Sequence, residues 1–165
     1  MKLNKIEITC DLAHFKIPYH SKIQRTYEIP PISTVVGILQ NIYGEDIDDF
    51  IFGYTIEHEG IYKDLHVIYK EFNINNQVKS PNNRERFTSD VCEIQYLINP
   101  KLIIYTNLNL EYKLNEILNL GKTDCLAKIV KIKSIKLINK SEFGYNQLTS
   151  KNIGTGVIER VSTET

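Results

Sequence analysis

Tryptophan is absent from this chain, methionine occurs once, and 20 lysine and arginine residues are matched by 20 aspartate and glutamate residues, so the net charge is zero. Without an excess of positive charge the protein has no general attraction for nucleic acid, and any contact with RNA or DNA has to be local. Apolar runs are too short to cross a bilayer, and strand-like alternation begins within the first residues, which leaves no room for a secretory signal. We therefore expect a cytoplasmic protein with no membrane partner.

Motifs for the common cofactors are missing as well. The sequence has no GxxxxGK, GxGxxG or GxSxG segment, so nucleotide hydrolysis, dinucleotide redox chemistry and serine-hydrolase chemistry have no support. The three cysteines, Cys10, Cys92 and Cys125, lack CxxC spacing, and their odd number argues against a disulfide framework. Cys10 and His14 are spaced as C-x3-H, but the second pair of ligands that a structural zinc site needs is absent. The sequence thus predicts reduced thiols, no metal and no cofactor.

A strand and a helix are expected near the start of the chain. Apolar and polar residues alternate over 6–12, which predicts a half-buried strand. After a loop and two prolines, apolar residues repeat at helical spacing over 32–43, and Gly44 is the expected stop. Ser33 and Thr34 are expected to cap the first amides of this helix. Such a helix end is either a phosphate site or an ordinary capped terminus.

Turn residues between alternating segments predict two hairpins, one turning at Glu59-Gly60 and one at Asn99-Pro100. Residues 73–90 lie between the hairpins, are rich in asparagine and have no periodic apolar set. This segment is expected to be a long projecting loop, either functional or disordered. The expected strands of the two hairpins are 50–58 with 65–69, and 92–98 with 102–106.

The remaining pattern favours an α+β fold. Helical spacing returns over 107–120 with Gly121 as the stop, and a last strand follows over 127–137, where the alternation slips near Ile132 as a β-bulge requires. This order of elements predicts a ferredoxin-like sandwich, in which two helices cover an antiparallel sheet and a thumb-like loop or hairpin is inserted. We expect residues 1–140 to form that domain, with the thumb at about 70–92 and a polar tail without a clear second domain over 141–165.

Lysine is concentrated in the C-terminal third of the chain. These residues form either a solvated strand face or a surface that meets RNA or an acidic partner protein. They are Lys128, Lys131, Lys133, Lys136 and Lys140.

Groups that could cleave RNA without a metal occur near the first helix. Such cleavage needs a base for the ribose 2′-hydroxyl, an acid for the leaving oxygen and a cation for the phosphorane. His14, His20, Tyr19 and Lys16 carry groups of these types. Residue types alone do not separate catalytic residues from loop residues that contact RNA or solvent, so no catalytic residue is assigned.

Several motifs occur together in a distinctive order. Ala13-His14-Phe15-Lys16 follows the first strand, Tyr27-Glu28-Ile29-Pro30-Pro31-Ile32-Ser33 opens the first helix, and Glu93 to Pro100 and Leu120-Gly121-Lys122-Thr123 follow. Over residues 6–137 this series resembles the CRISPR-associated protein family numbered five, whose corresponding blocks include a Leu-Gly-Arg-Ser segment. Lys122 stands where that family more often has arginine, which keeps the charge but loses the bidentate fork. The chain is also short for the family.

The resemblance implies a RAMP-type fold and a place in a type I effector complex (Cascade), possibly of subtype I-B. There the protein would hold the 5′ handle of the CRISPR RNA beside the backbone and large subunits, while guide pairing supplies sequence specificity. Tyr27 or Phe15 would stack on a base, and the basic residues and the helix end would hold phosphates. The implied RNA-binding residues are His14, Lys16, Lys22, Arg25, Tyr27, Ser33, Thr34, Arg84, Arg86 and Lys122.

Two other functions stay open. Some members of the family cleave the CRISPR repeat themselves, so the protein is alternatively a metal-independent endoribonuclease. A protein-only interaction module is the second alternative, in which Arg25, Arg84 and Arg86 would have little effect on RNA retention.

Overall fold

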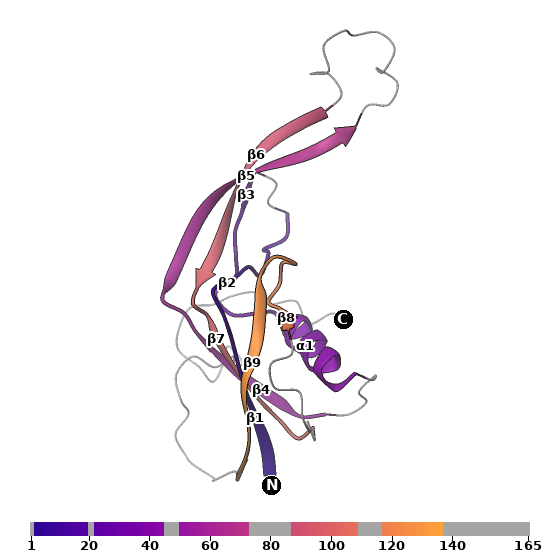
Figure 1. Cartoon of the computed structure of the whole chain (residues 1–165), viewed down its shortest axis with the longest axis vertical. Coiled ribbons are helices and arrows are strands. Elements are labelled where there is room, and N and C mark those ends of the chain that lie inside the picture. The colour runs from indigo at the N-terminus through magenta and orange to yellow at the C-terminus, as the bar shows by residue number, and fades with distance from the viewer. Residues whose placement is uncertain (1, 20–21, 45–49, 73–86, 109–116, 137–165) are drawn as a thin grey trace, which may run out of the picture.

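The computed structural model describes residues 2–19, 22–44, 50–72, 87–108 and 117–136. Two sheets and one helix form this part of the chain (Figure 1). The mostly antiparallel sheets and the helix confirm the α+β class. The ferredoxin-like arrangement with two helices stays a prediction.

The main sheet holds the body of the molecule together. All of its neighbouring strands are antiparallel, and their order is β4-β7-β1-β9-β8. Helix α1 packs against this sheet, and the core lies between them. The strands are β1 (Lys2–Cys10), β4 (Phe52–Glu57), β7 (Lys101–Thr106), β8 (Ile117–Asn119) and β9 (Leu126–Lys136). Side chains buried in the core include Ile6, Ile8, Val35, Leu39, Leu102, Ile104 and Ile129.

A second, smaller sheet carries the segment that precedes the helix. Its order is β2-β6-β3, and β5 also pairs with β6. The short strand β3 runs parallel to β6, whereas β2 and β5 are antiparallel to it. Figure 1 shows that β5 and β6 extend as a two-stranded ribbon away from the body. The strands are β2 (Leu12–Ala13), β3 (Ile23–Gln24), β5 (Gly60–Phe72) and β6 (Phe87–Ile98).

The two hairpins expected at Glu59-Gly60 and Asn99-Pro100 are wrong. β4 pairs with β7, and β5 pairs with β6, so the chain continues forward at both turns and passes from one sheet to the other. The two crossings lie side by side, because the amide of Glu59 donates to the carbonyl of Ile98 at 3.0 Å and Asn99 Nδ2 donates to Glu59 Oε2 at 2.9 Å. Asn99 has a φ of 47°, a conformation that asparagine tolerates. The turn residues therefore bend two paired strands together instead of reversing either one.

The projecting loop is shorter than expected at its end. β6 begins at Phe87, so the last four residues of the expected loop, 87–90, are strand. They pair with β5, which itself reaches Phe72. The loop residues 73–86 and the expected tail lie outside the described residues.

Helix α1 (Ile32–Tyr43) confirms the expected bounds, but its cap differs from the expected one. Gly44 ends it with a φ of 83° and donates its amide to the carbonyl of Gln40. Pro31 is the N-cap, and no side chain caps the helix. The expectation that Ser33 and Thr34 cap it is wrong, because both residues already lie in the first helical turn.

The second helix is not found where its end was expected. Residues 117–119 are the strand β8, which pairs with β9, so the helix expected to reach residue 120 is wrong over these residues. Residues 109–116 lie outside the described part of the chain. No helix among the described residues is long and apolar enough to cross a membrane.

The bulge expected in the last strand is confirmed, slightly earlier than its expected place. Glu7 pairs with Lys131 and Ile8 pairs with Ile129, which leaves Val130 as the additional residue. The insertion reverses the inward and outward positions along β9, and this explains why the alternation slips.

Tyr54 ties the start of α1 to the main sheet, and we expect its loss to destabilise the fold. Its hydroxyl donates to the carbonyl of Pro30 at 2.8 Å, and burial raises the pKa of Tyr54 to about 12. Tyr54→Phe leaves that carbonyl without its donor and should lower the free energy of unfolding by about 1 to 2 kcal/mol, as measured by urea denaturation. Tyr62→Phe, at a residue 46% exposed, is the matched control and should change it little. Equal effects of the two variants would contradict this role.

Candidate functional site

A pocket of about 340 Å³ lies where four separate segments of the chain meet. Four of the residues expected to bind RNA line it, namely His14, Lys16, Thr34 and Lys122. His14 and Lys16 follow β2, Thr34 belongs to the first turn of α1, and Lys122 follows β8. The other lining residues are Phe15, Gln24, Pro31 and Gly121.

Gly121 brings the segment after β8 against the segment after β2. Its φ is 87°, and a Cβ atom at this position would lie 1.8 Å from the carbonyl oxygen of His14. The amide of His14 also donates to the carbonyl of Leu120 at 3.3 Å. Only glycine allows this combination of positive φ and close backbone approach. The residue that sequence reasoning assigned as a helix stop therefore forms a wall of the pocket.

The uncapped start of α1 lies at the edge of the same pocket. The first hydrogen bonds of α1 run from the amides of Thr34 and Val35 to the carbonyl of Pro31, at 3.0 and 3.2 Å. The amides of Ile32 and Ser33 come before these two and have no acceptor within the helix. Because no side chain caps them, the positive end of the helix is open to an anion at the edge where Pro31 and Thr34 line the pocket.

His14 is a buried and neutral side chain. It is 3% exposed, and its Nδ1 lies 2.7 Å from the carbonyl of Gln95. A carbonyl only accepts, so Nδ1 carries the proton, and Nε2 is left as a covered acceptor without a partner. Burial lowers the pKa of His14, the bond to Gln95 partly offsets this, and the nearby Lys122 and Lys16 lower it further. The imidazole is thus held uncharged at the inner wall.

Lys122 is a cation fixed in place by its neighbours. Its Nζ donates to the hydroxyl of Tyr96 at 3.0 Å and to Asp124 Oδ2 at 2.9 Å. It also lies 5.6 Å from the centre of the Tyr96 ring. Burial opposes the charged form, but the bonds to Tyr96 and Asp124 outweigh it and raise the pKa of Lys122. An ammonium group has three protons to donate, so one remains for a ligand.

Tyr96 links Lys122 to a second histidine. It is 3% exposed, and its hydroxyl lies 3.2 Å from His66 Nε2, which is also 3.2 Å from Asp64 Oδ2. The rings of His14 and His66 flank Tyr96 at 5.7 and 6.0 Å between centroids. Sequence reasoning missed Tyr96 and Asp124, because Tyr96 occupies an ordinary inward position of a strand and nothing in the pattern distinguishes it from a core residue.

The other expected RNA-binding residues that the structure describes do not line the pocket. Lys22 and Arg25 are exposed. The carbonyl of Lys22 accepts from the amide of Glu93 on β6, and the carbonyl of Arg25 accepts from the amide of Ile17 within the loop. Tyr27 is partly buried against the core, and Ser33 lies in the first turn of α1 without lining the pocket. Arg84 and Arg86 lie outside the described residues.

Phe15 does line the pocket, but it is 2% exposed and belongs to the core. Its ring therefore has little free face for the stacking on a base that the resemblance implies.

A protein-family model matches this chain. The model described as CRISPR-associated protein (Cas_Cas5) matches residues 5–105, more than half of the chain. The chain belongs to this family. The match includes the segment after β2, the whole of α1 and both strands of the ribbon, and it ends before Gly121 and Lys122. A comparison with the curated proteins gave no match.

Two of the solved structures that match this chain are CRISPR complexes. A chain of the cryo-EM structure of the Type III-B Cmr-beta bound to cognate target RNA and AMPPnP is 12% identical, with a TM-score of 0.52, over 78% of this chain and 62% of that one. A chain of a CRISPR RNA-guided surveillance complex is 14% identical, with a TM-score of 0.41, over 64% of this chain and 49% of that one. This Cas5-family chain thus spans less than two thirds of the length of either, and the Cmr-beta likeness supports the fold.

Substitution of Gly121 tests the close approach that forms the pocket. In Gly121→Ala the new methyl group meets the carbonyl of His14 and the backbone keeps a positive φ, so the free energy of unfolding should fall by about 2 kcal/mol or more. Gly37→Ala in α1 is the matched control, because a Cβ there meets nothing within 4 Å. It should raise the free energy of unfolding by about 0.5 to 1 kcal/mol. If both variants shift chemical denaturation in the same direction, the proposed constraint is wrong.

The buried imidazole predicts a dependence of stability on pH. His14 has a lower pKa in the folded protein than the value of about 6.5 that it has in the unfolded chain. Between the two pKa values the unfolded chain binds more protons than the folded protein. The contribution of His14 to the free energy of unfolding is therefore fully present above a pH of about 6.5 and is lost as the pH falls through the folded pKa. His14→Gln should flatten this part of the stability profile, measured by urea denaturation from pH 7.5 to 5. A variant with the slope of the wild type would refute the assignment.

Proposed function

We propose that this CRISPR-associated protein is an RNA-binding subunit of a type I effector complex and that it holds the 5′ handle of the CRISPR RNA. The observation that carries the proposal is the pocket in which Lys16, Lys122 and the uncapped end of α1 meet. Two lysines and free helix amides are the groups that proteins use to hold backbone phosphates. Membership of the CRISPR-associated family makes the CRISPR RNA the expected ligand.

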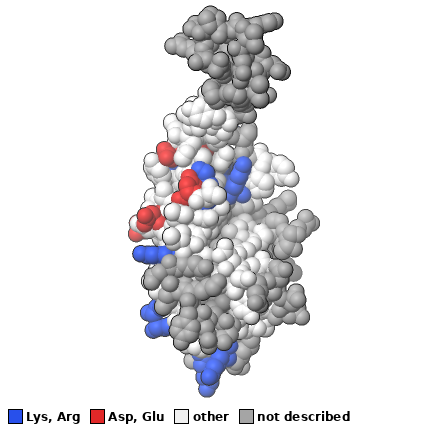
Figure 2. Space-filling model, turned by 45° about the vertical axis from the view of Figure 1, so that its right-hand side comes forward, with Lys and Arg blue, Asp and Glu red and all other residues white. Residues whose placement is uncertain are grey.

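The distribution of charge fits a subunit that makes local RNA contacts. Among the described residues on the face in Figure 2, acidic side chains lie beside basic ones in the upper part, and the basic side chains farther down are separated, so they do not form one broad basic surface. With a net charge of zero, nonspecific attraction is weak, and affinity has to come from a few positioned donors. Lys122 is such a donor, because Tyr96 and Asp124 fix its position before RNA arrives.

The shape of the fold supports assembly with other subunits. The β5–β6 ribbon projects from the body at the place of the expected thumb (Figure 1). We propose that this ribbon contacts the RNA and the neighbouring backbone subunit, together with Arg84 and Arg86, which come between its two strands in the sequence. The main-sheet order β4-β7-β1-β9 is compatible with the ferredoxin-like arrangement of a RAMP-type domain.

The endoribonuclease alternative has less support in this conformation. A general base has to reach the 2′-hydroxyl of RNA, but His14 Nε2 is covered and has no solvent-accessible surface to offer. Tyr19 is fully exposed and lines neither the pocket nor the core, and His20 lies outside the described residues. Cleavage of repeat RNA by the purified protein in EDTA would favour this alternative.

RNA binding should depend on the two lysines of the pocket. Full-length protein is titrated with labelled repeat RNA that carries the handle and with a scrambled RNA, in EDTA and over a series of salt concentrations. Lys16→Ala and Lys122→Ala should each weaken binding of the handle roughly tenfold near 0.1 M salt and reduce the salt slope by about 0.7. Lys122→Arg keeps the charge and should retain binding.

Lys2→Ala is the matched control, since Lys2 is an exposed lysine that pairs with Lys136 at the far end of the main sheet. Binding of the handle that is unaffected by both pocket substitutions would remove the pocket from the proposal. No binding to either RNA would leave the protein-only module as the better function.

A further inference from the structure

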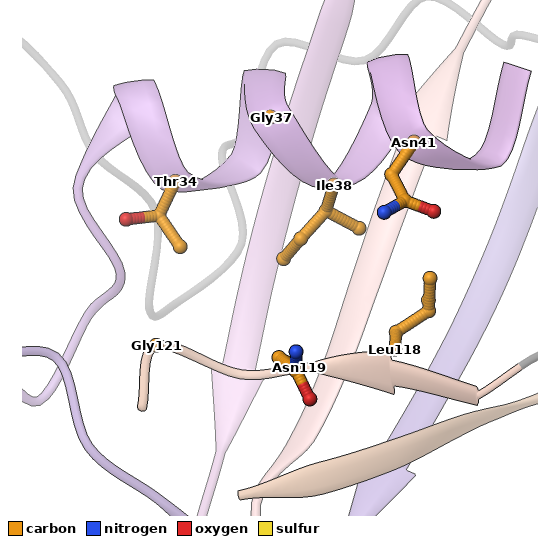
Figure 3. A pocket seen from close by; sticks show the side chains of 7 residues that line it. All are labelled: Thr34, Gly37, Ile38, Asn41, Leu118, Asn119 and Gly121. Carbon is orange, nitrogen blue, oxygen red and sulfur yellow. The ribbon is translucent and has the colours of Figure 1, made fainter. Parts of the chain in front are cut away.

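A second pocket of about 210 Å³ adjoins the first one. It lies between α1 and the end of β8, and Thr34 and Gly121 line both pockets. Figure 3 shows Thr34, Ile38 and Asn41 projecting from one face of the helix toward the segment that carries Leu118, Asn119 and Gly121. Their spacing of four and three residues places them on one helical face. The two pockets are therefore neighbouring compartments of one groove.

The lining of the second pocket differs chemically from that of the first. No charged side chain lines it, and its polar side chains are the amides of Asn41 and Asn119 and the hydroxyl of Thr34. Each amide offers both a donor and an acceptor, and both asparagines are exposed. Ile38 and Leu118 are buried and supply an apolar floor. The pocket thus has little to hold a phosphate but suits a group with apolar faces and a polar edge.

The size and the bare helix surface favour a flat group. The volume is below the range of about 300 to 1,000 Å³ that is typical of sites for drug-sized ligands, so one ring system is a better match. Gly37 lies between Thr34 and Ile38 at the wall, and a Cβ there would meet nothing within 4 Å. The helix therefore leaves space at the point where a planar ring would enter.

We propose that this second pocket binds one unstacked nucleobase of the CRISPR RNA, an inference that rests on the proposed function. Asn41 and Asn119 hydrogen-bond the polar edge of the base, and Ile38 and Leu118 contact the ring. The phosphate of the same or the adjacent nucleotide lies in the first pocket beside Lys16 and Lys122. Single-stranded RNA is commonly read in this way, through bases that are splayed out of the stack. The two asparagines then give the protein a preference at one nucleotide that the lysines alone do not supply.

Abasic scanning of the RNA tests the pocket directly. The full chain is titrated at constant salt with handle RNAs in which each nucleotide in turn lacks its base. One abasic position should weaken binding to the wild type about tenfold. The same abasic RNA should bind the Asn41→Ala/Asn119→Ala variant no more than about twofold more weakly than the intact RNA does, because the contact is already lost.

Two further variants guard against an indirect effect. Gly37→Leu keeps both amides but fills the space at the helix wall, and it should abolish the dependence on that base while improving helix propensity. Gln40→Ala removes a carboxamide from α1 that does not line the pocket, and it should keep the dependence of the wild type. Thermal unfolding of each variant checks that the fold is retained.

The outcomes separate this inference from the proposed function. If Lys16→Ala and Lys122→Ala weaken binding but no abasic position matters, the nucleobase pocket is overturned and the handle-binding function stands. The pocket is equally overturned if the double asparagine variant keeps the dependence of the wild type on the base. Failure of the wild type to bind any RNA overturns both.

Discussion

The backbone of Gly121 lies against the carbonyl of His14, and the geometry of the candidate site depends on this contact. His14 follows β2 of the small sheet, and Gly121 lies shortly after β8 of the main sheet. A positive φ at Gly121 lets these segments meet without an intervening side chain, and the turn that follows brings Lys122 onto Tyr96. Both compartments of the groove include Gly121, so one backbone contact sets the width of each.

Charge is used sparingly around this contact. Lys122 is partly neutralised by Asp124 and steadied by a buried tyrosine, and His14 is kept uncharged by burial. Such a site provides a few fixed donors instead of a diffuse positive field. In a protein that remains on one RNA within an assembly, fixed donors position that RNA. The absence of a diffuse positive field reduces the retention of unrelated polyanions.

The sequence correctly predicted the elements whose signals are local. Its predictions were wrong where contacts with distant segments determine the structure. Alternation in β1 and helical spacing in α1 report directly which side chains are buried, and Gly44 ends the helix as expected. Glu59-Gly60 and Asn99-Pro100 look like hairpin turns, yet they are bends, because the pairing partners are set across the ribbon. Four expected RNA-binding residues line one pocket, whereas the roles of Tyr96 and Gly121 come from neighbours far away in sequence.

The pairing of β4 with β7 continues into the pairing of β5 with β6 in one register. This register runs from Phe52 opposite Thr106 to Tyr69 opposite Ser89, on both sides of the bend. The bonds between Glu59, Ile98 and Asn99 fix that register at the body. Residues can therefore be added or removed between the distal ends of β5 and β6, and the residue pairs that lie nearer the core keep their partners. The length of the projection can therefore change over evolution independently of the domain that carries it.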